Sequence, residues 1–87
     1  GVAYLESGEH AKAVEDFRKA IKREPDNAAA HYNLACAYAL LKRRRDSVRA
    51  LEKAIALQPE LREEAQVDGD LENIRGEEGF ARLIMGL

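Results

Sequence analysis

Apolar side chains recur along the chain with helical spacing. Val14, Phe17, Ala20 and Ile21 are separated by three, three and one residues, and most positions between them are charged. This spacing places the four side chains on one face of an amphipathic helix. The same pattern returns 34 residues later in Val48, Leu51, Ala54 and Ile55. The chain therefore contains a structural unit that is repeated.

Two prolines mark where these helices end. Pro25 and Pro59 are also separated by 34 residues. Because the residue before a proline is pushed out of the α region, each helix should end just before its proline. In the stretch "PDNA" that begins at Pro25, Asp26 or Asn27 can accept hydrogen bonds from the first free amides of the next helix.

The pattern predicts five further elements. A helix over about 28–41, rich in alanine, is followed by a polar turn over 41–46. After the second amphipathic helix, residues 60–67 can form another helix that ends near Asp68 and Gly69. A short turn over 71–74 and a last helix over 77–85 follow, with Phe80, Leu83 and Ile84 facing inward.

Composition favours an all-α domain. The chain has 87 residues, enough for one small domain, with 6% aromatic residues, two prolines and no threonine. Residues 1–59 carry eleven basic against eight acidic side chains, whereas residues 60–87 carry three against eight. The net charge of −2 lacks the basic character of a nucleic-acid-binding protein.

No stretch has the roughly 20 apolar residues of a membrane span, and no signal-peptide pattern opens the chain. Cys36 is the single cysteine and cannot form an internal disulfide. We therefore expect a cytoplasmic protein with no membrane association.

The repeat resembles the tetratricopeptide repeat, a 34-residue helix–turn–helix unit. In the first copy the matching residues are Gly1, Tyr4, Gly8, Ala13, Phe17, Ala20 and Pro25. In the second copy they are Leu34, Ala35, Tyr38, Leu51, Ala54 and Pro59. The second copy departs from the family pattern at His31 in place of Trp, Ser47 in place of Ala and Lys42 in place of Gly.

This resemblance implies antiparallel helical hairpins stacked as a short right-handed solenoid. It divides the single domain into a truncated first repeat (1–27), a second repeat (28–61) and capping helices (62–87). The chain then corresponds to the C-terminal part of a longer array. Residues before about His10 would be the end of an inner helix, and an outer helix would begin near His10.

The tail resembles the closing segment of bacterial tetratricopeptide arrays. The matching residues are Asp70, Leu71, Ile74, Arg75, Phe80 and Leu83. A stacked array leaves its last helix pair half uncovered, and a capping element hides that face. We expect residues 62–87 to form this cap; the alternative is a partner-binding tail.

The sequence offers no catalytic set. His10 and His31 lie on different predicted helices without a carboxylate at metal-ligand spacing, and His31 replaces a core aromatic residue. Cys36 lies between alanines, which favours a close helix contact over a catalytic thiol, since a nucleophile needs a base beside it. We expect neither an enzyme nor a site for a metal or cofactor.

The run Lys42, Arg43, Arg44 and Arg45 is the densest positive patch. Two interpretations remain open for it. It is either a solvated turn between helices, or a docking site for an acidic partner or for the chain's own acidic tail.

The resemblance places partner binding on the concave face lined by the first helix of each pair. The predicted partner-binding residues are Val2, Leu5, Glu6, Ala29, Tyr32, Asn33, Cys36 and Leu40. Asn33 suits this role because its amide both donates and accepts hydrogen bonds. Of the carboxylate clamp found in chaperone-binding members, only Asn33 is present, and Glu63 stands where a clamp cation would be. An extended or helical apolar segment is the better fit.

Three functions remain open at this stage. The first is a non-catalytic scaffold for protein–protein contacts. The second is a self-association module whose exposed end is completed by dimerisation. The third is an accessory domain of a larger protein, whose catalysis would lie outside these residues.

Overall fold

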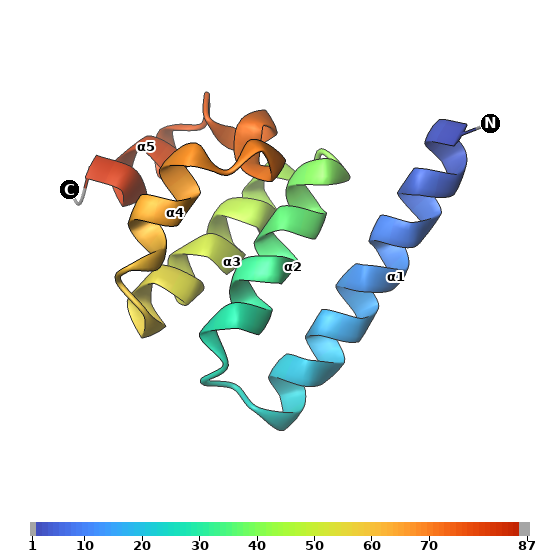
Figure 1. Ribbon diagram of the computed structural model, residues 1–87, viewed down its shortest axis with the longest axis horizontal. Helices are drawn as coiled ribbons and strands as arrows, with labels where there is room; N and C mark the ends of the chain where they lie inside the picture. Colours follow the sequence, from blue (N-terminus) through green and yellow to red (C-terminus); the bar gives the residue numbers. More distant parts are fainter. Residues whose placement is uncertain (1, 86–87) are drawn as a thin grey trace.

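The computed structural model describes residues 2–85, and the side chains of residues 8–85 apart from those of 70 and 73. These residues form an all-α fold without strands, in which consecutive helices pack against each other (Figure 1). The elements are α1 (Val2–Arg23), α2 (Ala28–Leu40), α3 (Arg44–Leu57), α4 (Leu61–Val67), the 3-10 helix η1 (Gly69–Ile74) and α5 (Glu78–Met85). The all-α fold expected from the sequence is confirmed.

The helix boundaries follow the sequence signals. α1 and α3 end shortly before Pro25 and Pro59. Asn27 is the N-cap of α2, and its side-chain oxygen accepts a hydrogen bond of 3.1 Å from the Ala30 amide. Of the two capping candidates in "PDNA", Asn27 is therefore the one that caps the helix.

α1 differs from the expectation. The sequence predicted an inner helix that ends before His10, but α1 continues without a break through Gly8. Adding a residue to an existing helix gains a hydrogen bond at little cost, whereas a separate short helix needs its own unfavourable nucleus. The helix start expected near His10 is therefore wrong for this structure.

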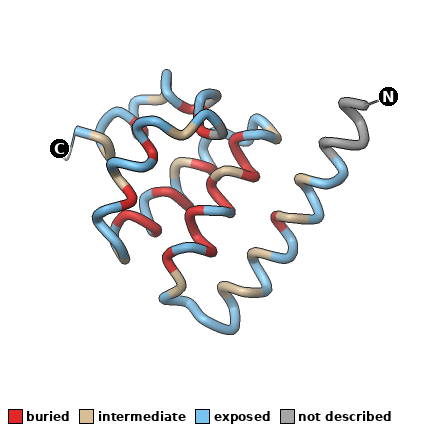
Figure 2. Tube along the Cα trace, viewed as in Figure 1, coloured by how far each residue is buried: buried red, intermediate tan, exposed pale blue. Residues whose placement is uncertain are grey.

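The core is centred on α2, which lies between α1 and α3 (Figures 1 and 2). Ala35 and Ala39 of α2 and Ala54 of α3 are fully buried, so that α2 and α3 approach closely. Ser47 replaces the usual alanine at this contact, and its hydroxyl donates a hydrogen bond of 2.7 Å to the Ala35 carbonyl. That bond satisfies the hydroxyl inside the core.

Residues after Pro59 join the same core. Leu71 and Ile74 of η1 are 0% exposed, and η1 packs on α2. Phe80 of α5 is buried and Leu83 and Ile84 are half-buried, as their spacing predicted. The Arg62 guanidinium donates a hydrogen bond of 2.9 Å to the Leu83 carbonyl, which joins α4 to α5. The acidic C-terminal third is thus folded onto the repeat.

Candidate partner-binding surface

One face of α2 is open along its whole length. Ala29, Asn33, Cys36 and Leu40 are spaced by four, three and four residues, so they lie in a single stripe along the helix. Ala29, Asn33 and Leu40 are exposed and Cys36 is half-buried. Leu40 is 39% exposed, which is unusual for a large apolar side chain in this chain. Four of the predicted partner-binding residues thus share one surface, which we call the α2 stripe.

Asn33, Cys36 and Leu40 of the α2 stripe form one wall of a groove. The other wall is made by α1, and the cavity of about 220 Å³ is lined by His10, Ala13, Phe17, Asn33, Cys36, Ala37 and Leu40. Most of these side chains are apolar, and the polar groups come from His10 and Asn33. We call this hollow the α1–α2 groove.

The α1 side of the groove was missed at the level of sequence. The sequence predicted no role in binding for His10, and it placed Phe17 in the repeated apolar stripe. Phe17 is half-buried and lines the groove as well as packing on the core. The helical spacing of His10, Ala13 and Phe17 was the available signal, but it could not tell which neighbour that face would meet.

Tyr32 is placed differently from the rest of the predicted set. It is only 6% exposed, and its hydroxyl donates a hydrogen bond of 2.7 Å to Asp68 Oδ2. Burial, followed by this hydrogen bond and the nearby carboxylate charge, holds the pKa of Tyr32 well above its ordinary value of 10.0. Cys36 Sγ lies 3.9 Å from the same oxygen. Tyr32 therefore packs against the segment after α4 and does not line the groove.

The side chains of Val2, Leu5 and Glu6 lie outside the described residues. His31 is buried, and its Nε2 donates a hydrogen bond of 2.9 Å to the Pro25 carbonyl. A packed core histidine was the prediction for this position. Within the part of the chain that the structure describes, no three His, Cys, Asp or Glu side chains are grouped so that they could hold a metal ion.

The basic run after α2 is partly used within the fold. Arg43 forms an ion pair of 2.9 Å with Asp46, and its guanidinium lies 5.1 Å from the centre of the Tyr38 ring. Glu77 of the acidic tail lines a hollow together with residues 42–46. The charges of the run are therefore not all directed to solvent.

Lys42 adopts the left-handed conformation, with a φ of 62°. The Arg43 amide donates a hydrogen bond of 2.9 Å to the Tyr38 carbonyl, and the Lys42 amide donates one of 3.0 Å to Ala39. This is the helix-ending geometry for which glycine is the usual residue. It accounts for the glycine that the family pattern has at this position.

Comparison with known proteins gives two family matches. A family model described as TPR repeat matches residues 1–42, and one described as Tetratricopeptide repeat matches residues 28–61. Neither a curated protein nor a solved structure gives a significant match. None of the helices in the described part of the chain is both long enough and apolar enough to cross a membrane.

Proposed function

Because this chain belongs to the tetratricopeptide repeat family, we propose that it is a non-catalytic scaffold that binds an apolar segment of a partner protein in the α1–α2 groove. Tetratricopeptide repeats are in general protein–protein interaction motifs. The observation that carries the proposal is the α2 stripe, because an exposed leucine next to a groove is the kind of site that an apolar anchor of a partner fills.

The chemistry of the groove favours an uncharged segment. Asn33 offers one amide that can hold a partner's backbone, and the remaining wall is mainly apolar. Among the described residues, the lining contains no Lys or Arg, and the Asp68 carboxylate lies beside Tyr32 and Cys36. A terminal carboxylate would find no cation there, which argues against heat-shock tail peptides as ligands.

A matched pair of variants tests this proposal. Leu40→Glu places a charge in the groove, while Met85→Glu introduces the same change at a 68% exposed position on α5, away from the groove. Peptides selected from a displayed random library on the immobilised chain are labelled, and their affinity is measured by fluorescence anisotropy. Circular dichroism checks that both variants keep their helix content.

We expect Leu40→Glu to lower the affinity of the chain for the selected peptides by about tenfold to a hundredfold. This is the equivalent of losing one buried leucine-sized contact. Met85→Glu should bind as the unmodified chain does. Equal binding by all three proteins would overturn the proposal. So would light scattering that shows a dimer which Leu40→Glu dissociates, because the groove would then serve self-association.

A further inference from the structure

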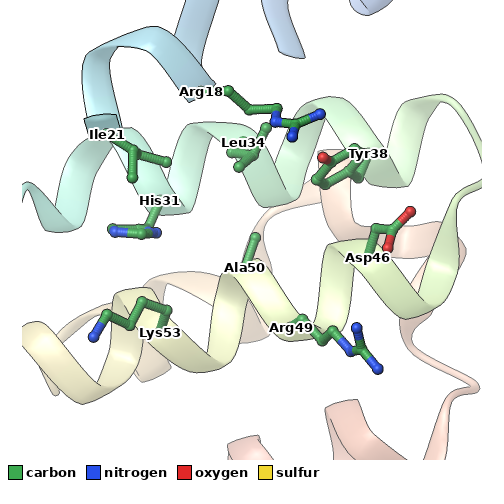
Figure 3. A pocket seen from close by; sticks show the side chains of 9 residues that line it. All are labelled: Arg18, Ile21, His31, Leu34, Tyr38, Asp46, Arg49, Ala50 and Lys53. Carbon is green, nitrogen blue, oxygen red and sulfur yellow. The ribbon is translucent and has the colours of Figure 1, made fainter. Parts of the chain in front are cut away.

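We propose that a second groove, between α1 and α3, binds an acidic amphipathic segment of a partner protein. The cavity has a volume of about 380 Å³ (Figure 3). Its floor is formed by α2 through His31, Leu34 and Tyr38, which lie on the opposite side of that helix from the α2 stripe. This α1–α3 groove is therefore separate from the surface of the proposed function.

The floor of the α1–α3 groove is apolar. Ile21 of α1, Leu34 of α2 and Ala50 of α3 converge on it from the three helices (Figure 3). Leu34 and Ala50 are buried and Ile21 is half-buried, so their side chains form a floor rather than projecting into solvent. An aliphatic or aromatic side chain of a partner would remove this surface from water.

The walls of the groove are positively charged. Arg18 of α1 and Arg49 and Lys53 of α3 line it, and all three are exposed. Among the side chains that the structure describes, none of these three cations has an acidic partner. Asp46, the carboxylate among the described residues of the lining, is already paired with Arg43 at 2.9 Å. The groove thus carries a positive charge that the fold does not neutralise.

The spacing of the cations suits a helical ligand. Arg49 and Lys53 are four residues apart along α3, so they lie in a row on one face of the helix, which Arg45 continues just outside the groove lining. A partner helix with carboxylates at the same interval and apolar side chains beside them would meet both the row and the floor. Complementary charges of this kind increase the association rate and select the partner.

The same features argue against a nucleic acid. Two rings from the described part of the chain line the groove: the Arg43 guanidinium already lies 5.1 Å from the centre of the Tyr38 ring, and His31 is buried. Single-stranded nucleic acid is held by stacking on several accessible rings. The net charge of −2 also disfavours a polyanion that contacts the whole surface.

The test uses three labelled helical peptides of about 15 residues, a length at which isolated helices become marginally stable. The first has Glu at every fourth position on one face and Leu on the adjacent face. The second has Lys in place of Glu, and the third has Ser in place of Leu. Fluorescence anisotropy measures their binding to the full chain and to its variants.

Two double variants with the same change in net charge separate a local effect from a general one. Arg49→Glu/Lys53→Glu reverses the charge of two cations that line the groove. Lys12→Glu/Arg23→Glu reverses the charge of two exposed cations outside its lining. We expect the Glu/Leu peptide to bind the unmodified chain and to bind the groove variant about tenfold more weakly or worse. The control variant should bind it nearly as well as the unmodified chain, and the Lys/Leu peptide should prefer the groove variant.

Three results would overturn the inference. One is equal loss in the control variant, which would mean a response to net charge alone. Another is binding of the Glu/Ser peptide with the same affinity as the Glu/Leu peptide, which would show that the apolar floor does not contribute to binding. The third is failure of the Glu/Leu peptide to bind the unmodified chain. Leu40→Glu should leave this peptide's affinity unchanged, so the result is independent of the α1–α2 groove.

Discussion

The Tyr32 hydroxyl donates a hydrogen bond of 2.7 Å to Asp68 Oδ2, a residue 36 positions later in the chain. Tyr32 lies in the middle of α2, whereas Asp68 is the C-cap of α4. Cys36, one turn further along α2, lies 3.9 Å from the same oxygen. This contact joins the repeat to the acidic C-terminal segment beside the groove in which we place partner binding.

Removing either partner of this hydrogen bond should destabilise the chain. Tyr32→Phe deletes the hydroxyl and keeps the ring, and Asp68→Ala leaves the buried hydroxyl without its acceptor. We expect each change to lower the free energy of unfolding by about 1.5–3 kcal/mol, the range for a hydrogen bond to a charged group. Urea denaturation followed by circular dichroism measures it.

The double variant Tyr32→Phe/Asp68→Ala checks that the two residues act through each other. Its loss of stability should be smaller than the sum of the single losses by roughly 0.5 kcal/mol or more. Strictly additive losses would show that the two side chains do not interact in solution.

The same contact predicts a dependence on alkaline pH. Because burial and Asp68 raise the pKa of Tyr32 in the folded state above the ordinary 10.0, the neutral phenol is favoured by folding. This contribution is fully present below the pKa of the unfolded state and is lost as the pH rises above it. Between about pH 9 and about pH 11, the unmodified chain should therefore lose stability more steeply than Tyr32→Phe. Parallel curves in urea denaturation would contradict the prediction.

Gly79 marks a close contact between α5 and α3. A Cβ atom added at this position would lie 2.8 Å from Val48 Cγ1, and the branched Val48 side chain has little freedom to move away. We expect Gly79→Ala to lower the free energy of unfolding by about 1–3 kcal/mol through overpacking. In a Val48→Ala background, Gly79→Ala should lower the free energy of unfolding by much less. Thermal or urea unfolding of the four proteins tests this, and an equal cost in both backgrounds would contradict it.

Lys42 carries backbone strain that glycine would relieve. Its φ of 62° lies in the left-handed region, which a residue with a Cβ atom adopts only at a cost. Lys42→Gly should raise the free energy of unfolding by about 0.5–1 kcal/mol, after the greater flexibility of glycine in the unfolded chain is included. Lys42→Ala is the control, since it removes the charge but keeps the Cβ atom, and it should give no such gain.

Gly8 lies inside the continuous helix α1, and a Cβ atom added there would touch nothing within 4 Å. Gly8→Ala should therefore stabilise the chain by about 0.5–1 kcal/mol and raise its helix content. Circular dichroism and urea denaturation measure both effects. Unchanged or lower stability of Gly8→Ala would contradict the prediction.

The α-helices, their order and most of their ends were predictable from the sequence. The apolar spacing around Phe17 and Leu51 determines which face of each helix is buried, because it depends only on the helical period. Pro25 and Pro59 stop the helices before them, and Asn27 caps α2 through a contact only three residues long. All of these are local interactions, so a single sequence is enough to read them.

The candidate sites depended much more on tertiary structure. Asn33, Cys36 and Leu40 share a face by helical spacing, but the groove that they line exists only because α1 supplies the facing wall through His10 and Phe17. Likewise, the cations of α3 become part of one groove with Arg18 only because both helices flank α2.

The sequence by itself determined the repeat, the helical faces and the local ends of the helices. Only the tertiary structure decided that Tyr32 forms a hydrogen bond with Asp68, and which helix faces enclose the two grooves. The reason is physical. Periodicity and capping act within one or two helical turns, whereas these features arise from packing between segments that lie far apart along the chain and compete for the same surface.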